Sequence, residues 1–104
     1  IIGGSGGVGS IAIQLAKLAG LQVVATASRP ESEAWCRAMG ADFIIDHMAP
    51  LTSQLKEKGC STVDYILNAS STDRHWGAMA EVIKPQGRIC ALVNAEHPLD
   101  LNVL

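Results

Sequence analysis

Apolar positions along the chain fall into helix-like stretches that alternate with short continuous apolar runs. From Gly7 to Ala19 they recur at three- and four-residue spacing, which predicts a helix. The apolar face expected for this helix consists of Val8, Ile11, Ala12, Leu15, Leu18 and Ala19. Further helices are predicted from Pro30 onward, with Ser28 as a candidate cap, from Pro50 to about Lys58, and from Thr72 to Ile83 with Asp73 near its start.

The apolar runs between these helices predict strands. Ile1-Ile2 is predicted to be the end of a first strand. Four more strands are predicted at Gln22–Ala27, Phe43–Asp46, Val63–Asn68 and Arg88–Val93, the last of them after a turn at Pro85–Gly87. Most of these runs are continuous, as in a parallel sheet covered on both faces. Strands that alternate with helices over short connections predict an α/β sheet of right-handed βαβ units.

Composition and charge narrow the class of protein. The chain has 104 residues, 48% of them hydrophobic, which suits one folded domain and excludes disorder. The net charge of −2 argues against nucleic-acid binding, and no apolar run is long enough to span a membrane. The three cysteines, Cys36, Cys60 and Cys90, are widely spaced and are expected to be buried thiols. We therefore expect a cytoplasmic protein without nucleic-acid or membrane partners.

The two ends of the sequence suggest a longer protein. The chain opens with Ile1-Ile2 inside an apolar run and has no initiator methionine, so we expect it to be a fragment. At the other end, Leu99–Leu104 alternates weakly and is expected to be extended. A sixth strand is therefore expected to be missing or incomplete.

Glycines cluster near the start, between the first strand and the first helix. Gly4-Ser5-Gly6-Gly7-Val8-Gly9 satisfies the spacing G-x-G-x-x-G, in the strand–turn–helix context that the motif requires. In this motif Gly4 permits the tight turn, Gly6 lets a pyrophosphate approach the backbone, and Gly9 lets the helix pack closely. The amides at the helix N-terminus then bind the phosphates. The motif predicts a dinucleotide-binding site on a Rossmann-type doubly wound parallel sheet of about five strands, in the order 3-2-1-4-5.

A second motif overlaps the same residues. Gly3-Gly4-Ser5-Gly6-Gly7 also fits the G-x-S-x-G nucleophile elbow of α/β hydrolases, with Ser5 as nucleophile and a histidine such as His97 following. That motif leaves Gly7 and Gly9 unexplained. A phosphate-binding P-loop is excluded because no lysine follows the glycines.

The end of the second strand bears on which dinucleotide is bound. NAD sites place an acid there to bind the ribose 2′-hydroxyl, but this chain has Ser28 and Arg29, with no acid before Glu31. A guanidinium suits a 2′-phosphate, so NADP(H) is predicted over NAD(H). The alternative is that Arg29 is only a solvated loop charge.

Other candidate cofactor contacts follow the later strands, because ligands of such sheets lie at the carboxyl ends of strands. These candidates are His47, Asn68, Ser70, Leu92 and Val93. Asn68 and Ser70 are small polar groups that suit ribose or nicotinamide atoms. The alternative for Ser70 is a cap on the following helix.

Several stretches together resemble a known family. Gly3–Ser10 followed by Ile13-Gln14-Leu15-Ala16-Lys17, then Met39–Asp42, Val63-Asp64 and Ile83–Arg88, resemble the medium-chain dehydrogenase/reductase superfamily. The nearest branch is similar to quinone oxidoreductases and zinc-type alcohol dehydrogenase-like proteins. The resemblance covers nearly the whole chain.

The resemblance implies a two-domain oxidoreductase, of which this chain is the cofactor-binding part. Such enzymes commonly use NADPH and pass hydride to a quinone, enone or carbonyl substrate, which the absent catalytic domain would bind. A further match is the pair Ile45-Asp46; the branch often has a tyrosine after this pair, where this chain has His47. The zinc ligands of the family belong mainly to the other domain and none maps onto the three cysteines, so no zinc is expected here. The longer protein is expected to be a homo-oligomer.

No catalytic residue is predicted within the chain. His47, His75 and His97 are far apart in sequence without metal-ligand spacing, and His75, beside Trp76, is expected on the helix surface. Hydride chemistry belongs to the cofactor, so the fragment alone is expected to be nearly inactive. Two alternatives remain open: a non-catalytic nucleotide-sensing module of the same fold, and the hydrolase with Ser5 as nucleophile.

Overall fold

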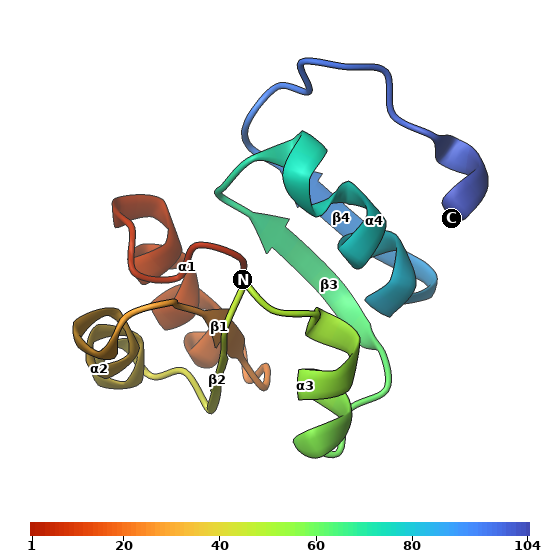
Figure 1. Cartoon of the computed structure of the whole chain (residues 1–104). Helices are drawn as coiled ribbons and strands as arrows, with labels where there is room; N and C mark the ends of the chain where they lie inside the picture. The colour runs from red at the N-terminus through yellow and green to blue at the C-terminus, as the bar shows by residue number, and fades with distance from the viewer.

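The computed structural model describes all 104 residues, and its helices alternate with short parallel strands (Figure 1). In chain order the elements are α1 (Gly7–Leu18), β1 (Val24–Thr26), α2 (Pro30–Met39), β2 (Phe43–Ile45), α3 (Leu51–Glu57), β3 (Val63–Asn68), α4 (Thr72–Val82), β4 (Ile83–Ala91) and a short 3-10 helix, η1 (Leu101–Val103). The α/β class is confirmed, and each predicted helix is present with slightly different bounds.

The strands form two separate parallel pairs. β1 pairs with β2 and β3 pairs with β4, so the structure has two two-stranded sheets and does not confirm one sheet of five strands. The predicted first strand is reduced to Ile2, which forms one parallel bridge with Asn68. Gly3 turns the chain away immediately after it, with φ +85°, and this leaves too few residues for a ladder.

The segment that contains Ile2 nevertheless joins the two pairs. The Ile2 amide donates to the Leu67 carbonyl of β3 at 2.9 Å, while the Thr26 amide of β1 donates to the Ile1 carbonyl at 2.9 Å. The N-terminus accordingly lies between the two halves in Figure 1. The segments therefore follow one another in the predicted order, even though the central strand is not formed as such.

The last strand begins earlier than predicted. Val63 pairs with Ile83 and Tyr65 pairs with Arg88, so β4 carries extra residues over this interval and the predicted turn at Pro85–Gly87 becomes an irregularity inside the strand. Gln86 has φ 66°, which bends the chain locally without ending the pairing. The expected extended segment at the C-terminus is also wrong, because it contains η1.

Two hydrophobic clusters form the core. One gathers α3, α4 and the strands around Ile2: Ile2, Ile45, Leu51, Leu55, Ile66, Met79 and Val82. The other lies between α1, α2 and β1: Ile13, Val23, Ala25, Ala27 and Cys36. Each half of the molecule thus has its own cluster, with α1 packed against α2 and α3 packed against α4.

The face of α1 that packs inward differs from the predicted one. Val8, Ile11, Leu15 and Leu18 are exposed, Leu18 by 84%, whereas Ile13 is fully buried together with Gly9 and Ser10. Gly9 causes this orientation, because its lack of a side chain lets the helix approach the glycine loop at that point. The predicted apolar stripe exists but lies on another side of the helix.

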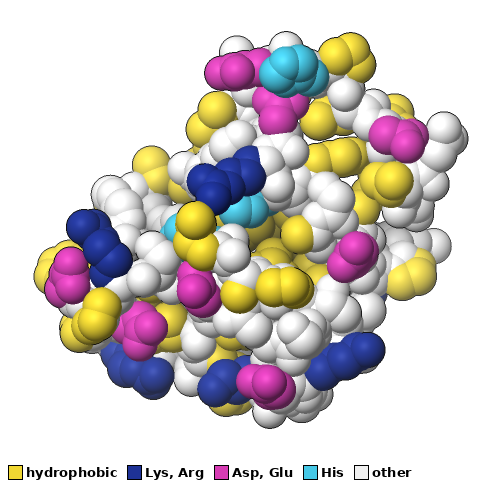
Figure 2. All heavy atoms as spheres, viewed as in Figure 1, with side chains coloured by type: hydrophobic (Ala, Val, Ile, Leu, Met, Phe, Trp, Pro, Cys, Tyr) yellow, Lys and Arg dark blue, Asp and Glu magenta, His cyan; other side chains and the backbone are white.

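Charged and apolar side chains are mixed on the surface. On the face shown in Figure 2, Lys and Arg side chains stand in several separate places and apolar side chains lie between them. None of the helices combines the length and the apolar content that a membrane crossing requires.

Candidate functional site

The glycine loop between Ile2 and α1 is held by the end of β1. The Gly3 amide donates to the Thr26 hydroxyl at 3.0 Å, and the Gly4 amide donates to the Thr26 carbonyl at 3.2 Å. Gly3 has φ +85°, so it supplies the left-handed turn that the motif assigned to Gly4. Thr26 itself was not predicted as a site residue, although a hydroxyl at the end of an apolar strand was a signal for it.

Two other glycines are required by close packing. A Cβ at Gly4 would lie 2.9 Å from the Cβ of Ala25, and a Cβ at Gly9 would lie 2.2 Å from the Gly3 carbonyl oxygen. Real Cβ atoms do not approach backbone oxygens this closely, so Gly9 allows α1 to begin directly over the loop. This close approach agrees with the packing that the motif predicts for its last glycine.

The first turn of α1 carries backbone amides without hydrogen-bond acceptors. Gly6 is the N-cap, its amide donates to the Gly3 carbonyl at 3.3 Å, and its carbonyl accepts the Ser10 amide at 2.9 Å. The amides of Gly7, Val8 and Gly9 have no acceptor in the helix because they belong to its first turn. A Cβ at Gly7 would meet nothing within 4 Å, and the first turn carries no acidic side chain. The arrangement suits an anion.

The backbone of the loop argues against the hydrolase alternative. A nucleophile elbow holds its serine on a strained turn. Gln86 is the non-glycine residue with positive φ in this chain, so Ser5 does not have the positive φ of a strained turn. His97, the histidine considered for that site, contacts Asp73 at the start of α4.

The residues that follow β1 are accessible to solvent. Ser28 and Arg29 are both exposed, and the Arg29 Nε lies 3.6 Å from a carboxylate oxygen of Glu31. The N-cap of α2 is Arg29, without a side-chain hydrogen bond, so the prediction of Ser28 as the cap is wrong. Pro30 occupies the first helical position, where its missing N–H costs nothing, so the cap position falls on Arg29 and not on Ser28.

Two histidines that are far apart in sequence, His47 and His75, meet beside the loop. The His47 Nδ1 lies 3.1 Å from the Thr26 hydroxyl, and the His47 and His75 ring centroids are 6.1 Å apart in an edge-to-face arrangement. His75 is 4% exposed, so its predicted surface position is wrong. Burial, His47 and Arg74 lower the pKa of His75 below its usual value, and its Nε2 has no hydrogen-bond partner. Its ring is therefore kept neutral.

Asn68 stabilises the turn between β3 and α4. Its side chain is fully buried, accepts the Ser70 amide at 2.9 Å and donates to the Ser71 carbonyl at 3.2 Å. The cap of α4 is Ser71, whose hydroxyl accepts the Arg74 amide at 3.2 Å, rather than the predicted alternative Ser70. Ser70 is partly exposed at this turn.

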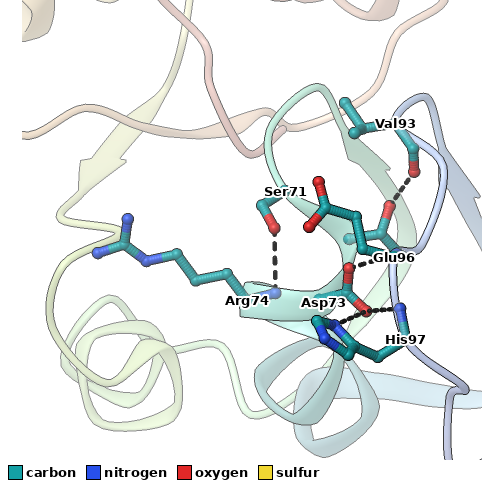
Figure 3. Close-up of polar contacts among 7 residues, drawn as sticks. Ser71, Asp73, Arg74, Val93, Glu96 and His97 are labelled. Carbon is teal, nitrogen blue, oxygen red and sulfur yellow. Dashed lines mark hydrogen bonds and ion pairs between the residues drawn. The ribbon is translucent and has the colours of Figure 1, made fainter.

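The segment after β4 is fastened to the start of α4. The Leu92 amide donates to the Asn68 carbonyl at 3.1 Å, and the Val93 carbonyl accepts a hydrogen bond from the Thr72 hydroxyl. Figure 3 shows the neighbouring contact, in which the Asp73 carboxylate accepts the amides of Glu96 and His97 at 2.7 and 3.2 Å. These bonds hold the pKa of Asp73 below its usual value.

Asp73, Glu96 and His97 also form a cluster of possible metal-ligand residues that the spacing in the sequence did not indicate. One potential ligand atom of each side chain, a carboxylate oxygen or a ring nitrogen, lies within 4.8 Å of the other two. The two oxygens of Asp73 already bind main-chain amides, and the cluster contains no thiolate, so its chemistry fits a loop anchor better than a structural zinc site. Of the cysteines only Cys36 is buried, so the expectation of a buried thiol is wrong for the exposed Cys90.

The structure thus brings most of the predicted residues to one edge. The glycine loop, Thr26 and His47 are joined by hydrogen bonds, while Asn68, Leu92 and Val93 are joined at the ends of β3 and β4. An apolar cavity of about 370 Å³ lies between β1 and β3, and its lining includes Ile2 and Thr26 but no glycine of the loop. The candidate site is therefore an open edge and not this cavity.

The sequence of this chain is similar to dehydrogenases, both in a family model and in individual relatives. Residues 7–104 match the family model described as zinc-binding dehydrogenase. A zinc-type alcohol dehydrogenase-like protein of Staphylococcus aureus is 49% identical over 104 residues, which are the whole of this chain and 31% of that protein. The chain therefore spans about a third of the length of the curated relatives it matches.

Solved structures give the same result for the fold. A Rhizobium etli protein assigned as a zinc-dependent alcohol dehydrogenase has a TM-score of 0.91 and 39% identity, over 98% of this chain and 30% of that one. The quinone oxidoreductase of Thermus thermophilus, solved also in complex with NADPH, has a TM-score of 0.80 and 26% identity, over 99% of this chain and 33% of that one. The fold is that of the cofactor-binding domains of medium-chain dehydrogenases and reductases.

Proposed function

The chain belongs to the zinc-binding dehydrogenase family, and on that basis we propose that it is the NADP(H)-binding domain of an oxidoreductase. The longer enzyme transfers hydride between the nicotinamide and a quinone, enone or carbonyl/alcohol substrate. The family match alone supports the oxidoreductase class. The choice of cofactor and the residues that bind it rest on the geometry of the glycine loop.

The observation that carries the proposal is the N-terminus of α1. Gly7, Val8 and Gly9 have amides without intrahelical acceptors, and the space in front of Gly7 is open. A pyrophosphate fits this position because it is an anion, needs several donors, and must approach the backbone where no Cβ intervenes. We assign the pyrophosphate to Gly4, Ser5, Gly6, Gly7, Val8 and Gly9.

The preference for NADP(H) rests on Ser28 and Arg29. Both side chains are exposed just after β1, and no acid stands at the end of that strand to repel a 2′-phosphate. The ion pair of Arg29 with Glu31, at 3.6 Å between exposed groups, is weak and is broken at little cost. NADPH is also the ligand in the Thermus thermophilus complex, which supports the same assignment here.

The remaining proposed contacts lie at the ends of the later strands. His47, which is bonded to Thr26, is assigned to the adenosine end of the cofactor. Asn68, Ser70, Leu92 and Val93 are assigned to its ribose and nicotinamide end. The Asn68 side chain is fully buried and holds the backbone of Ser70 in place, while the Asn68 main-chain carbonyl holds that of Leu92.

The bound cofactor supplies the hydride, and the residues of this chain bind and orient it. The substrate-binding side of the enzyme is assigned to the part of the relatives that this chain does not span. The chain alone should therefore bind cofactor and show little or no turnover. No step is assigned to zinc, since the donor atoms present here do not form a zinc site.

Titration with NADPH and NADH tests the proposal. The variant Arg29→Ala removes the guanidinium, and Arg37→Ala serves as a matched control, because Arg37 lies at the opposite end of α2. We expect Arg29→Ala to weaken NADPH binding by about tenfold, the size of a partly solvated charge-assisted hydrogen bond, and to leave NADH binding nearly unchanged. Arg37→Ala should change neither.

Two results contradict different parts of the proposal. Binding of neither dinucleotide would overturn the cofactor-binding function. Preferential binding of NADPH that survives in Arg29→Ala would leave the function standing and show that the 2′-phosphate lies elsewhere.

A further inference from the structure

A chain of two hydrogen bonds links α2 to the glycine loop. The indole Nε1 of Trp35 lies 2.7 Å from the Ser10 hydroxyl, and this hydroxyl lies 2.6 Å from the Gly6 carbonyl oxygen. Trp35 is on α2 and Ser10 is on α1, so the contact spans 25 residues of sequence. Ser10 is 7% exposed and Trp35 is 49% exposed, so the contact is buried on the α1 side.

The direction of these bonds is determined by their chemistry. An indole N–H can only donate, so Ser10 accepts from Trp35 and its own hydrogen must go to another acceptor. The Gly6 carbonyl at 2.6 Å is much nearer than the Gly4 carbonyl at 3.5 Å. Gly6 also accepts the Ser10 amide at 2.9 Å, so its carbonyl oxygen carries two hydrogen bonds from one residue.

Fixing the Gly6 carbonyl fixes the direction of the next amide. The peptide between Gly6 and Gly7 is planar and trans, so its carbonyl and its N–H point in opposite directions. The carbonyl points into α1 toward Ser10, and the Gly7 N–H therefore points out from the start of the helix. Gly7 is exposed, and a Cβ there would meet nothing within 4 Å, so there is room for a ligand beside this residue.

We propose that Trp35 is a positioning residue for the cofactor: through Ser10 it holds the Gly6–Gly7 peptide so that the Gly7 amide faces the pyrophosphate. The proposal rests on the cofactor-binding function proposed above. Gly6 is the cap of α1 and Gly7 is its first residue, and glycine has the widest conformational freedom of all residues, so a restraint on the Gly6 carbonyl beyond the backbone bond from Ser10 helps to keep one orientation. Trp35 and Ser10 provide that restraint from outside the glycine motif.

The competing explanation is that the Trp35–Ser10 bond only holds α1 and α2 together. The two explanations predict different effects on stability and on cofactor binding. A structural link contributes to the stability of the free chain. A positioning role also changes binding, and it does so equally for NADPH and NADH, because the pyrophosphate is common to both. Loss of a neutral hydrogen bond changes binding by about threefold to tenfold.

The test compares Trp35→Phe, Ser10→Ala and the double variant with the wild-type chain. Trp76→Phe is the matched control, because the Trp76 indole also donates one hydrogen bond, to the Asp100 carbonyl at 2.9 Å, on α4. The measurements are dissociation constants for NADPH and NADH, the unfolding temperature without cofactor, and the NMR signal of the Gly7 amide.

We expect Trp35→Phe and Ser10→Ala each to raise both dissociation constants by about threefold to tenfold, with the ratio between them unchanged. The double variant should bind no more weakly than the weaker single variant, because both substitutions break the same chain of bonds. The Gly7 amide signal should shift in Trp35→Phe and stay in place in Trp76→Phe.

The proposal is overturned if Trp35→Phe and Ser10→Ala bind both dinucleotides as tightly as Trp76→Phe, whatever happens to their unfolding temperatures. Additive losses in the double variant also overturn it. If the wild-type chain binds neither dinucleotide, the proposed function fails and this inference fails with it. Should Trp35→Phe not fold, Ser10→Ala alone gives the same decision through its dissociation constants.

Discussion

The hydroxyl of Thr26 accepts a hydrogen bond from the amide of Gly3 at 3.0 Å. This contact ties the last residue of β1 to the residue that turns the chain into the glycine loop. The same hydroxyl lies 3.1 Å from His47, so one side chain joins the loop to the segment after β2. Thr26 is 3% exposed, so a replacement without a hydroxyl leaves the Gly3 amide and His47 without this partner.

Replacing Thr26 by valine keeps the shape of the side chain and removes the hydroxyl. We expect Thr26→Val to lower the free energy of unfolding by about 1–3 kcal/mol, because the Gly3 amide loses its acceptor away from water. Urea unfolding measures the loss. Thr62→Val is the control, since Thr62 is exposed, and it should change stability by less than about 0.5 kcal/mol. Equal stability of the two variants would contradict the importance of the contact.

Gly9 tests the close approach of α1 to the loop. In Gly9→Ala the new Cβ would lie 2.2 Å from the Gly3 carbonyl oxygen, so the helix must move away from the loop. We expect a loss of stability of about 2 kcal/mol, as in other overpacked sites. Displaced amides should also weaken NADPH binding by about tenfold, because each broken hydrogen bond to the pyrophosphate costs about 1 kcal/mol.

Gly77 provides the matched control for this substitution. It lies within α4, is exposed, and a Cβ there would meet nothing within 4 Å. Gly77→Ala should raise stability by about 0.5–1 kcal/mol, because alanine favours the helix, and should leave NADPH binding unchanged. If Gly9→Ala behaves like Gly77→Ala, α1 does not depend on the close approach at Gly9.

The lowered pKa of His75 leads us to expect that the stability of the chain depends on pH. Burial, His47 and Arg74 lower its pKa in the folded chain below the unfolded value of about 6.5. The unfolded chain therefore binds more protons over this range, and the contribution of His75 is present above about pH 6.5 and is lost as pH falls toward its folded pKa. Unfolding experiments from pH 7.5 to 5.5 should show stability decreasing with acidity.

Substitution of His75 isolates this effect. In His75→Phe the decrease in stability between pH 7.5 and 5.5 should be smaller than in the wild-type chain, whatever the stability at the upper pH. Thr62→Val is the control and should keep the wild-type slope, because Thr62 is exposed and has no titratable side chain. An unchanged slope in His75→Phe contradicts the assignment.

The sequence predicted those features that depend on local chemistry. Glycines with the required spacing, Pro30 at a helix start and continuous apolar runs identified the loop, α2 and most of the strands. The sequence correctly predicted which residues form the apolar stripe of α1, but the stripe faces solvent and not the core. Periodicity describes one face of a helix, whereas the contact of Gly9 with Gly3 determines which face turns inward.

Features that depend on contacts between distant segments were predicted less well. His75 was expected at the surface, but it is buried against His47, 28 residues earlier in the sequence. The hydrogen bond of Trp35 with Ser10 and the contact of Asp73 with the segment after β4 have no local signature either. Such contacts come from the packing of complete elements, which spacing within one element does not encode.

The central claim is that the amides at the start of α1 bind the cofactor pyrophosphate. An NMR titration of the isotopically labelled chain with NADPH tests it most directly, because each amide gives its own signal. We expect the signals of Gly7, Val8 and Gly9 to move most and to reach a plateau, while the signal of Gly77 on α4 stays in place. If NADPH leaves the signals of Gly7, Val8 and Gly9 unmoved, the claim is contradicted.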